Sequence, residues 1–71
     1  MNYRGIVPSG PEAGDPVVAD GVKYRIRSLG AIGHGLEFAN LREHFAPNRE
    51  LAVYVDRLEW DKVAGVWRVK A

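Results

Sequence analysis

A chain of 71 residues that is 46% hydrophobic has room for one small domain and is too apolar to be a disordered segment. It contains no cysteine, which excludes disulfide bonds and thiolate metal sites. The net charge of +1 gives no overall attraction to nucleic acid or anionic lipid, so any electrostatic role must come from the distribution of the charges.

The first residues lack the basic and apolar regions of a signal peptide. No apolar run approaches the roughly 18 to 20 residues of a membrane span. The absence of cysteine also fits a reducing compartment. We therefore expect a cytoplasmic protein without a membrane segment.

The beginning of the chain predicts a short strand and then a long loop. Tyr3–Val7 is the candidate first strand. Residues 8–16 contain three prolines and two glycines, a composition that cannot hold a ladder of hydrogen bonds. We interpret this loop as a connection or a mobile flap within a single domain that spans residues 1–71.

Residues 16–29 predict a β-hairpin around Asp20 and Gly21, because both residues tolerate a positive φ. This turn pairs Ala19 with Val22 and Val17 with Tyr24 on one face, which Ile26 continues. The other face then carries Val18, Lys23, Arg25 and Arg27.

The middle of the chain predicts a flexible loop, a short strand and a short helix. Gly30–Gly35 is the expected loop, and Leu36–Ala39 the expected strand, with Leu36 and Phe38 facing inward. Asn40 and Glu43 then resemble a capping box at the start of a helix over residues 41–46, which would bury Leu41 and Phe45. A longer helix that begins near Leu36 is the alternative.

The last part predicts a strand at Leu51–Val55 and a hairpin over residues 57–69. A four-residue loop at 62–65 places Gly65 where such loops need a positive φ. The resulting register pairs Trp60 with Trp67, Leu58 with Val69, and Glu59 with Arg68.

Together these elements predict an all-β fold of five or six short antiparallel strands with one short helix. A chain of this length must curl such strands into a small barrel or roll to bury two tryptophans. An SH3-like barrel is one candidate, on architecture alone.

Two glycines, Gly21 and Gly65, are each followed by a strand in which apolar and basic residues alternate. Side chains on one face of such a strand lie about 6.6 Å apart, close to the phosphate spacing of a nucleic acid strand. One hypothesis is therefore nucleic-acid binding, with Tyr54 available for stacking. The basic set is Lys23, Arg25, Arg27, Arg68 and Lys70. The alternative is a solvated face neutralised by nearby carboxylates.

The hypothesis we favour is a small, non-catalytic accessory protein that binds another protein. Ile32, flanked by small residues, would be the apolar anchor, with His34 and Tyr54 as further contacts and the 8–16 loop beside them. The size and composition are typical of phage or mobile-element accessory proteins, which bind host or virion proteins. A homo-oligomer that pairs through an edge strand such as Tyr3–Val7 is a third possibility.

Nothing in the sequence indicates an enzyme or a cofactor. Ser9 and Ser28 have no evident base beside them. His34 and His44 lack the spacing of a helical metal pair, and no further ligand stands out. The glycines at 30–35 are not followed by the helix of a dinucleotide site. We therefore expect no catalytic residues, no metal and no cofactor.

Overall fold

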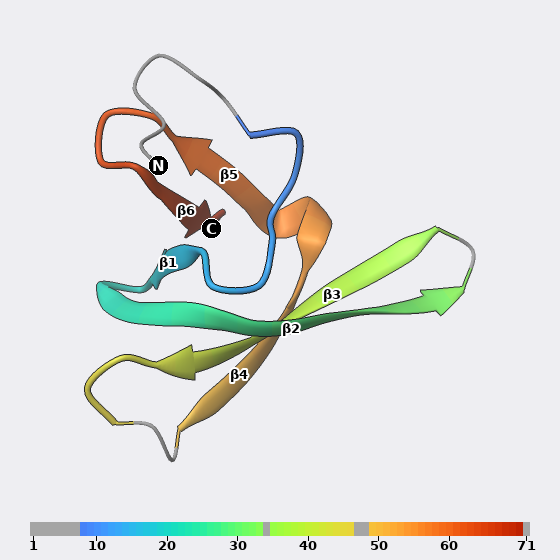
Figure 1. Ribbon diagram of the computed structural model, residues 1–71, viewed down its shortest axis with the longest axis horizontal. Helices are drawn as coiled ribbons and strands as arrows, with labels where there is room; N and C mark the ends of the chain where they lie inside the picture. The colour runs from blue at the N-terminus through green and yellow to red at the C-terminus, as the bar shows by residue number, and fades with distance from the viewer. Residues whose placement is uncertain (1–7, 34, 47–48, 71) are drawn as a thin grey trace.

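The computed structural model describes residues 8–33, 35–46 and 49–70, which form one β-sheet and its connections (Figure 1). Along the chain the elements are β1 (Pro16–Ala19), β2 (Val22–Gly33), β3 (Leu36–Glu43), β4 (Glu50–Tyr54), the 3₁₀ turn η1 (Val55–Arg57), β5 (Leu58–Asp61) and β6 (Val66–Val69). This confirms the predicted all-β class. Among the described residues, no helix has the length and apolar character to cross a membrane.

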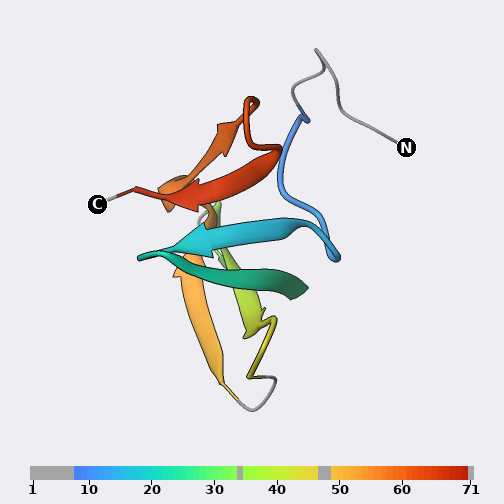
Figure 2. The same ribbon diagram turned by 90° about the vertical axis from the view of Figure 1, so that its left-hand side faces the viewer.

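The sheet has six strands in the order β4-β3-β2-β1-β6-β5 (Figure 2). All neighbours are antiparallel except β1 and β6, which are parallel. The prediction of a small fold of five or six strands is confirmed, but the pairing is mixed rather than antiparallel throughout, and the sheet is not closed into a barrel. The reason is the C-terminal hairpin, which returns beside β1 in the direction of β1 and leaves β4 and β5 as the two edges. An SH3-like arrangement stays a prediction.

Both predicted hairpins are confirmed in their register. At the first turn Asp20 and Gly21 have φ values of 52° and 78°, so both residues of the loop adopt the positive φ that such a turn needs. In the second hairpin Trp60 pairs with Trp67, and the two rings lie 5.2 Å apart at an interplanar angle of 64°. Gly65, at the last loop position, has a φ of 71°.

The predicted helix over residues 41–46 is wrong, because β3 continues to Glu43. Ala39 and Leu41 are both fully buried, which is the alternation of a strand. Asn40 caps no helix: its Nδ2 donates to Ser28 Oγ on β2 at 3.0 Å. Phe45 is 79% exposed and is therefore not buried together with Leu41. Pairing with a strand on each side therefore overrides the local capping signal.

Residues 30–33 also differ from the expectation, since they belong to β2 and not to a flexible loop. The ladder between β2 and β3 shifts register between Ile26 and Ser28 and again between Ala31 and Gly33. Such bulges increase the twist of a strand pair. The long β2–β3 hairpin consequently extends away from the rest of the sheet (Figure 1).

The curled sheet encloses one small core. Its buried members come from β1, β2, β3, β5 and β6: Val17, Ile26, Ala39, Leu41, Leu58 and Trp67. Tyr24, Val53, Val55, Trp60 and Val69 pack around them. The expectation that the tryptophans belong to the core is confirmed for Trp67, while Trp60 is partly buried at its border.

The loop that precedes β1 is tied to the sheet. The amide of Gly14 donates to the carbonyl of Ile26 at 2.8 Å, and the amide of Ile26 donates to the carbonyl of Asp15 at 2.9 Å. Asp15 Oδ2 also accepts a bond from Trp67 Nε1 at 3.1 Å. Of the two interpretations of this loop, the structure supports a fixed connection for residues 14–16. The predicted strand Tyr3–Val7 lies outside the described residues.

Candidate functional site

The candidate site lies on the face of β2, β3 and β4 that points away from Ala39 and Leu41, which we call the outer face. Directly paired residues share a face of a sheet, so the ladders define which side chains lie there. Three cross-strand rows follow: Gly30–Phe38–Tyr54, Ser28–Asn40–Ala52 and Arg25–Arg42–Glu50.

Phe38 and Gly30 form the centre of the first row. A Cβ atom placed on Gly30 would lie 2.6 Å from Cζ of Phe38, far inside van der Waals contact. The far end of the Phe38 ring therefore lies close to the backbone of β2, at a position where glycine leaves room for it. This placement corrects the expectation that Phe38 faces inward.

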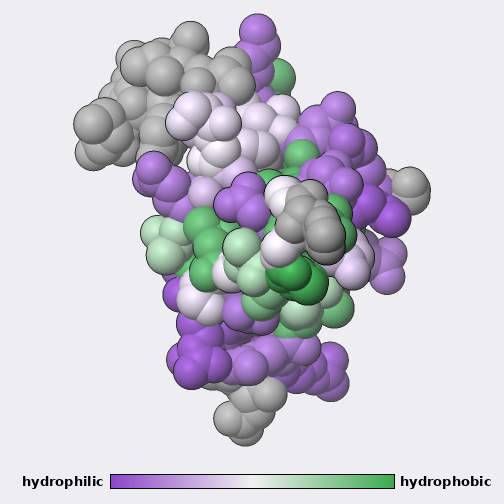
Figure 3. Space-filling view, turned by 90° about the vertical axis from the view of Figure 1, so that its right-hand side faces the viewer, coloured by the Kyte–Doolittle hydropathy of each residue, from purple (hydrophilic) through white to green (hydrophobic). Residues whose placement is uncertain are grey.

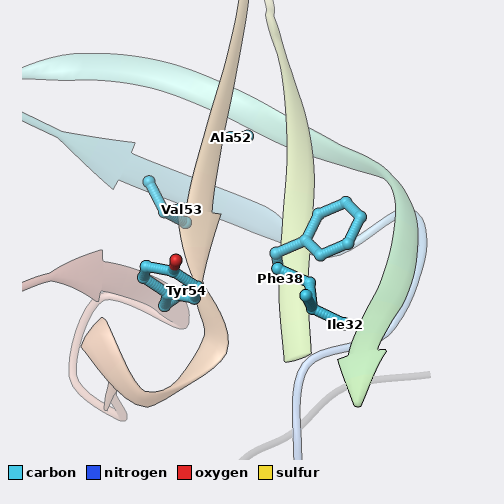
Figure 4. A pocket seen from close by; sticks show the side chains of 5 residues that line it. All are labelled: Ile32, Phe38, Ala52, Val53 and Tyr54. Carbon is cyan, nitrogen blue, oxygen red and sulfur yellow. The ribbon is translucent and has the colours of Figure 1, made fainter. Parts of the chain in front are cut away.

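An apolar groove of about 320 Å³ opens beside this ring, lined by Ile32, Phe38, Ala52, Val53 and Tyr54 (Figure 4). Ile32 and Tyr54 are 58% and 50% exposed. Figure 3 views the molecule from the end of the β2–β3 hairpin. Apolar surface gathers there in the middle of the molecule, between hydrophilic regions. The structure thus brings together two of the three predicted partner contacts, and the third, His34, lies outside the described residues.

Two arginines share one carboxylate beside this groove. Arg27 Nη1 lies 2.7 Å from Glu50 Oε2, and Arg42 Nη2 lies 3.5 Å from the same oxygen. All three side chains are about half exposed. The outer face therefore has an apolar, aromatic end and a cationic end, separated by the row that contains Ala52.

The five predicted basic residues lie on β2, on β6 and just after β6, and β1 lies between these two strands. Lys23 and Arg68 do lie in one row, because both are paired with Val18. Arg27 sits at the bulge and turns to Glu50 on β4. Arg25 donates to the carbonyl of Gly14 at 2.6 Å. Lys70 continues the strand direction of β6, where its amide donates to the carbonyl of Arg57 at 2.8 Å.

A second hollow, of about 270 Å³, lies next to Lys23 and Arg25. His44 and Phe45 also line it, and their rings meet edge to face at 4.7 Å. Phe45 is thus an exposed aromatic side chain beside two cations. The sequence did not indicate this position, because Leu41 and Phe45 have the spacing of two residues buried on one side of a helix.

The carboxylate of Asp61, at the end of β5, accepts hydrogen bonds at both of its oxygens. Its Oδ2 accepts a bond from Arg68 Nε at 2.7 Å, and its Oδ1 accepts bonds from the amides of Val63 and Ala64 at 3.0 Å. The bond from Arg68, followed by that from Ala64, lowers the pKa of Asp61 below 3.8. Asp61 therefore stays ionised and shapes the β5–β6 loop.

The described residues contain no group of three or more His, Asp or Glu side chains that could hold a metal ion. Ser28 Oγ is bonded to the amide of Asn40. Comparisons with protein-family models, with curated proteins and with solved structures found no match for this chain.

Proposed function

We propose that this protein is a non-catalytic binding protein that recognises another protein through the groove beside Phe38. The observation that carries the proposal is the gathering of Ile32, Phe38 and Tyr54 around one apolar groove. A domain of this size needs most of its large apolar side chains in the core. Exposed apolar side chains that converge on a hollow are typical of protein interfaces.

The biological setting that we propose follows from size and composition. A cysteine-free chain of 71 residues fits a cytoplasmic accessory protein of a phage or mobile element, with a host or virion protein as its partner. The proposal includes no enzymatic step and no cofactor.

Affinity capture with matched variants tests the proposal. Ile32→Asp places a charge in the groove, whereas Val63→Asp places the same charge on a loop residue that is 94% exposed. We expect the first variant to weaken binding of a captured protein by about 30-fold or more, as at interface hot spots, and the second to leave it unchanged. Equal capture by both variants would exclude the groove as the binding surface.

A second candidate function is nucleic-acid binding at the other end of the outer face, around Lys23 and Arg25 near the start of β2. It is supported by the row that contains Lys23 and Arg68 and by Phe45 in the hollow beside Lys23. One observation argues against this candidate. Arg68 forms an ion pair with Asp61, which reduces the positive charge that Arg68 offers to a phosphate.

Titration with mixed-sequence oligonucleotides at two salt concentrations tests this candidate. If it holds, amide signals of residues 23–25 and 44–45 shift, and the affinity falls as salt rises, by about one unit of log–log slope per phosphate contact. Absence of shifts at low salt would leave these residues as a solvated face.

A further inference from the structure

We propose that two copies of this chain associate through β4, antiparallel to each other, around a two-fold axis at Ala52. The proposal goes beyond binding at the groove and does not depend on it. Three features carry it: the unprotected edge of β4, the self-complementary outer face, and the exposed apolar side chain on the opposite face.

β4 is an edge strand without the usual protection against pairing. Its sequence, from Glu50 to Tyr54, contains no proline, and its one charged residue is Glu50. The carboxylate of Glu50 is already paired with Arg27 and Arg42. The other edge strand, β5, carries an acidic residue at every second position, Glu59 and Asp61. Charged side chains and prolines are the features that keep sheet edges apart, so β4 is the edge open to another strand.

The outer face is self-complementary around Ala52. An antiparallel pair centred on this residue places Glu50 of one copy opposite Tyr54 of the other, twice by symmetry. One strand further in, Arg42 continues this row behind Glu50, and Phe38 continues it behind Tyr54 of the other copy. The row across the two copies therefore alternates a cationic and anionic pair with two aromatic side chains, and the Tyr54 hydroxyl can donate to the facing carboxylate of Glu50.

The opposite face has matching features. The same register pairs Leu51 of one copy with Val53 of the other, and Leu51 is 40% exposed in the single chain. Cross-strand apolar pairs of this kind stabilise antiparallel sheets. Ala52 itself is exposed and small, so two copies can approach at the axis without a steric clash.

Such an axis is perpendicular to the sheet, which has two consequences. The six strands of each copy become one continuous sheet, and both outer faces point to the same side. The two apolar grooves would then lie on one surface, each bordered by Glu50 of the other copy. A partner with two copies of its own motif would bind such a pair with a gain in avidity.

Sedimentation equilibrium from micromolar to millimolar concentration tests the proposal. We expect the mass of the unmodified protein to rise from 7.9 kDa toward twice that value. Ala52→Lys and Ala52→Glu each place like charges opposite each other at the axis and weaken association by about tenfold or more. An equimolar mixture of the two variants restores association, because Lys then faces Glu.

Val63→Lys and Val63→Glu are the matched controls, since they add the same charges on the distant β5–β6 loop and should leave the mass unchanged. If either Ala52 variant fails to fold by circular dichroism, Leu51→Ser removes the inner-face pair and should weaken association. Three results would overturn the proposal: a mass of one chain at every concentration, association that neither Ala52 charge weakens, or association that both charges weaken and their mixture does not restore. Loss of partner capture by Ile32→Asp in a monomeric protein would leave the proposed function standing.

Discussion

Asp15 shows how one side chain can hold a loop, a strand and the core together. Its Oδ2 accepts a bond from the indole of Trp67 at 3.1 Å and another from the amide of Glu12 at 2.9 Å. Trp67 is 6% exposed, so its N–H group has little access to water. A buried donor that loses its partner is costly, which makes this carboxylate a determinant of stability.

We expect Asp15→Ala to lower the free energy of unfolding by about 1–3 kcal/mol, because the indole N–H of Trp67 loses its acceptor. Asp15→Asn keeps an amide oxygen at this position and should lose less. Urea denaturation followed by tryptophan fluorescence measures both. Equal stability of the Ala variant and the unmodified protein would show that the bond to Trp67 contributes nothing.

The lowered pKa of Asp61 predicts that the stability of the fold depends on pH. Its pKa is lower in the folded chain than the ordinary 3.8, so the folded state binds its proton less readily than the unfolded state. Its contribution is present above that value and is lost as the pH falls through the folded pKa.

Thermal unfolding of Asp61→Asn provides the comparison. The amide oxygen can still accept the bonds of the loop, but the group no longer titrates. We expect a lower Tm than that of the unmodified protein at neutral pH, and a difference that narrows as the pH falls below 3.8. A difference that is constant with pH would exclude this carboxylate as the source of the dependence.

At the scale of elements, the β2–β3 hairpin determines the candidate site. Its bulges shift the register, and its outer face places Phe38 on Gly30. Gly30 and Phe38 are therefore energetically coupled, because the Phe38 ring occupies the space that a side chain at position 30 would need.

A double-mutant cycle measures this coupling. Gly30→Ala forces the Phe38 ring to move and should narrow the groove. We expect it to lower the free energy of unfolding by about 1–3 kcal/mol and not more, because the far end of the ring can turn away. In a Phe38→Ala background the same substitution should cost much less. Additive effects of the two changes would contradict the contact.

The hairpins at 16–25 and 58–69 could be predicted from sequence because their turns and cross-strand pairs are local. Asp20, Gly21 and Gly65 specify the turns, and the facing pairs confirm the register. Residues 30–46 could not be predicted, since β3 is stabilised by neighbours on both sides that the local sequence does not contain. The sequence indicated Ile32 and Tyr54 separately, as two possible contacts. That both line one groove with Phe38 depends on the bulges of the β2–β3 ladder and on the pairing of β3 with β4, which are not local in sequence.

At the scale of the whole molecule, the described residues form two antiparallel parts, β1–β4 and β5–β6, which are joined by the parallel pair of β1 and β6. That pair has two register positions, Val17 with Trp67 and Val18 with Arg68. Val17 is 1% exposed and lies at this junction, in the core shared by both parts. Cooperativity between the two parts therefore depends on few residues.

We expect Val17→Ala to lower the free energy of unfolding by about 2–3 kcal/mol, and Val63→Ala to have almost no effect. Tryptophan fluorescence follows β5 and β6, whereas far-ultraviolet circular dichroism follows the whole sheet. The two signals should show one common transition in both variants. Separate transitions would mean that the two parts unfold independently.

The parallel pair also has a consequence for the order of folding. Val17 and Trp67 are 50 positions apart in the chain, so this contact closes a long loop of sequence. Pairings of high sequence separation form late, because the entropy lost in closing the loop precedes the gain from the contact. During synthesis β1 has only β2 beside it until residues 66–69 have left the ribosome. β1 therefore lacks its second neighbour until almost the entire described sequence has been synthesised. Until then its open edge is exposed to pairing with any other unfolded chain nearby.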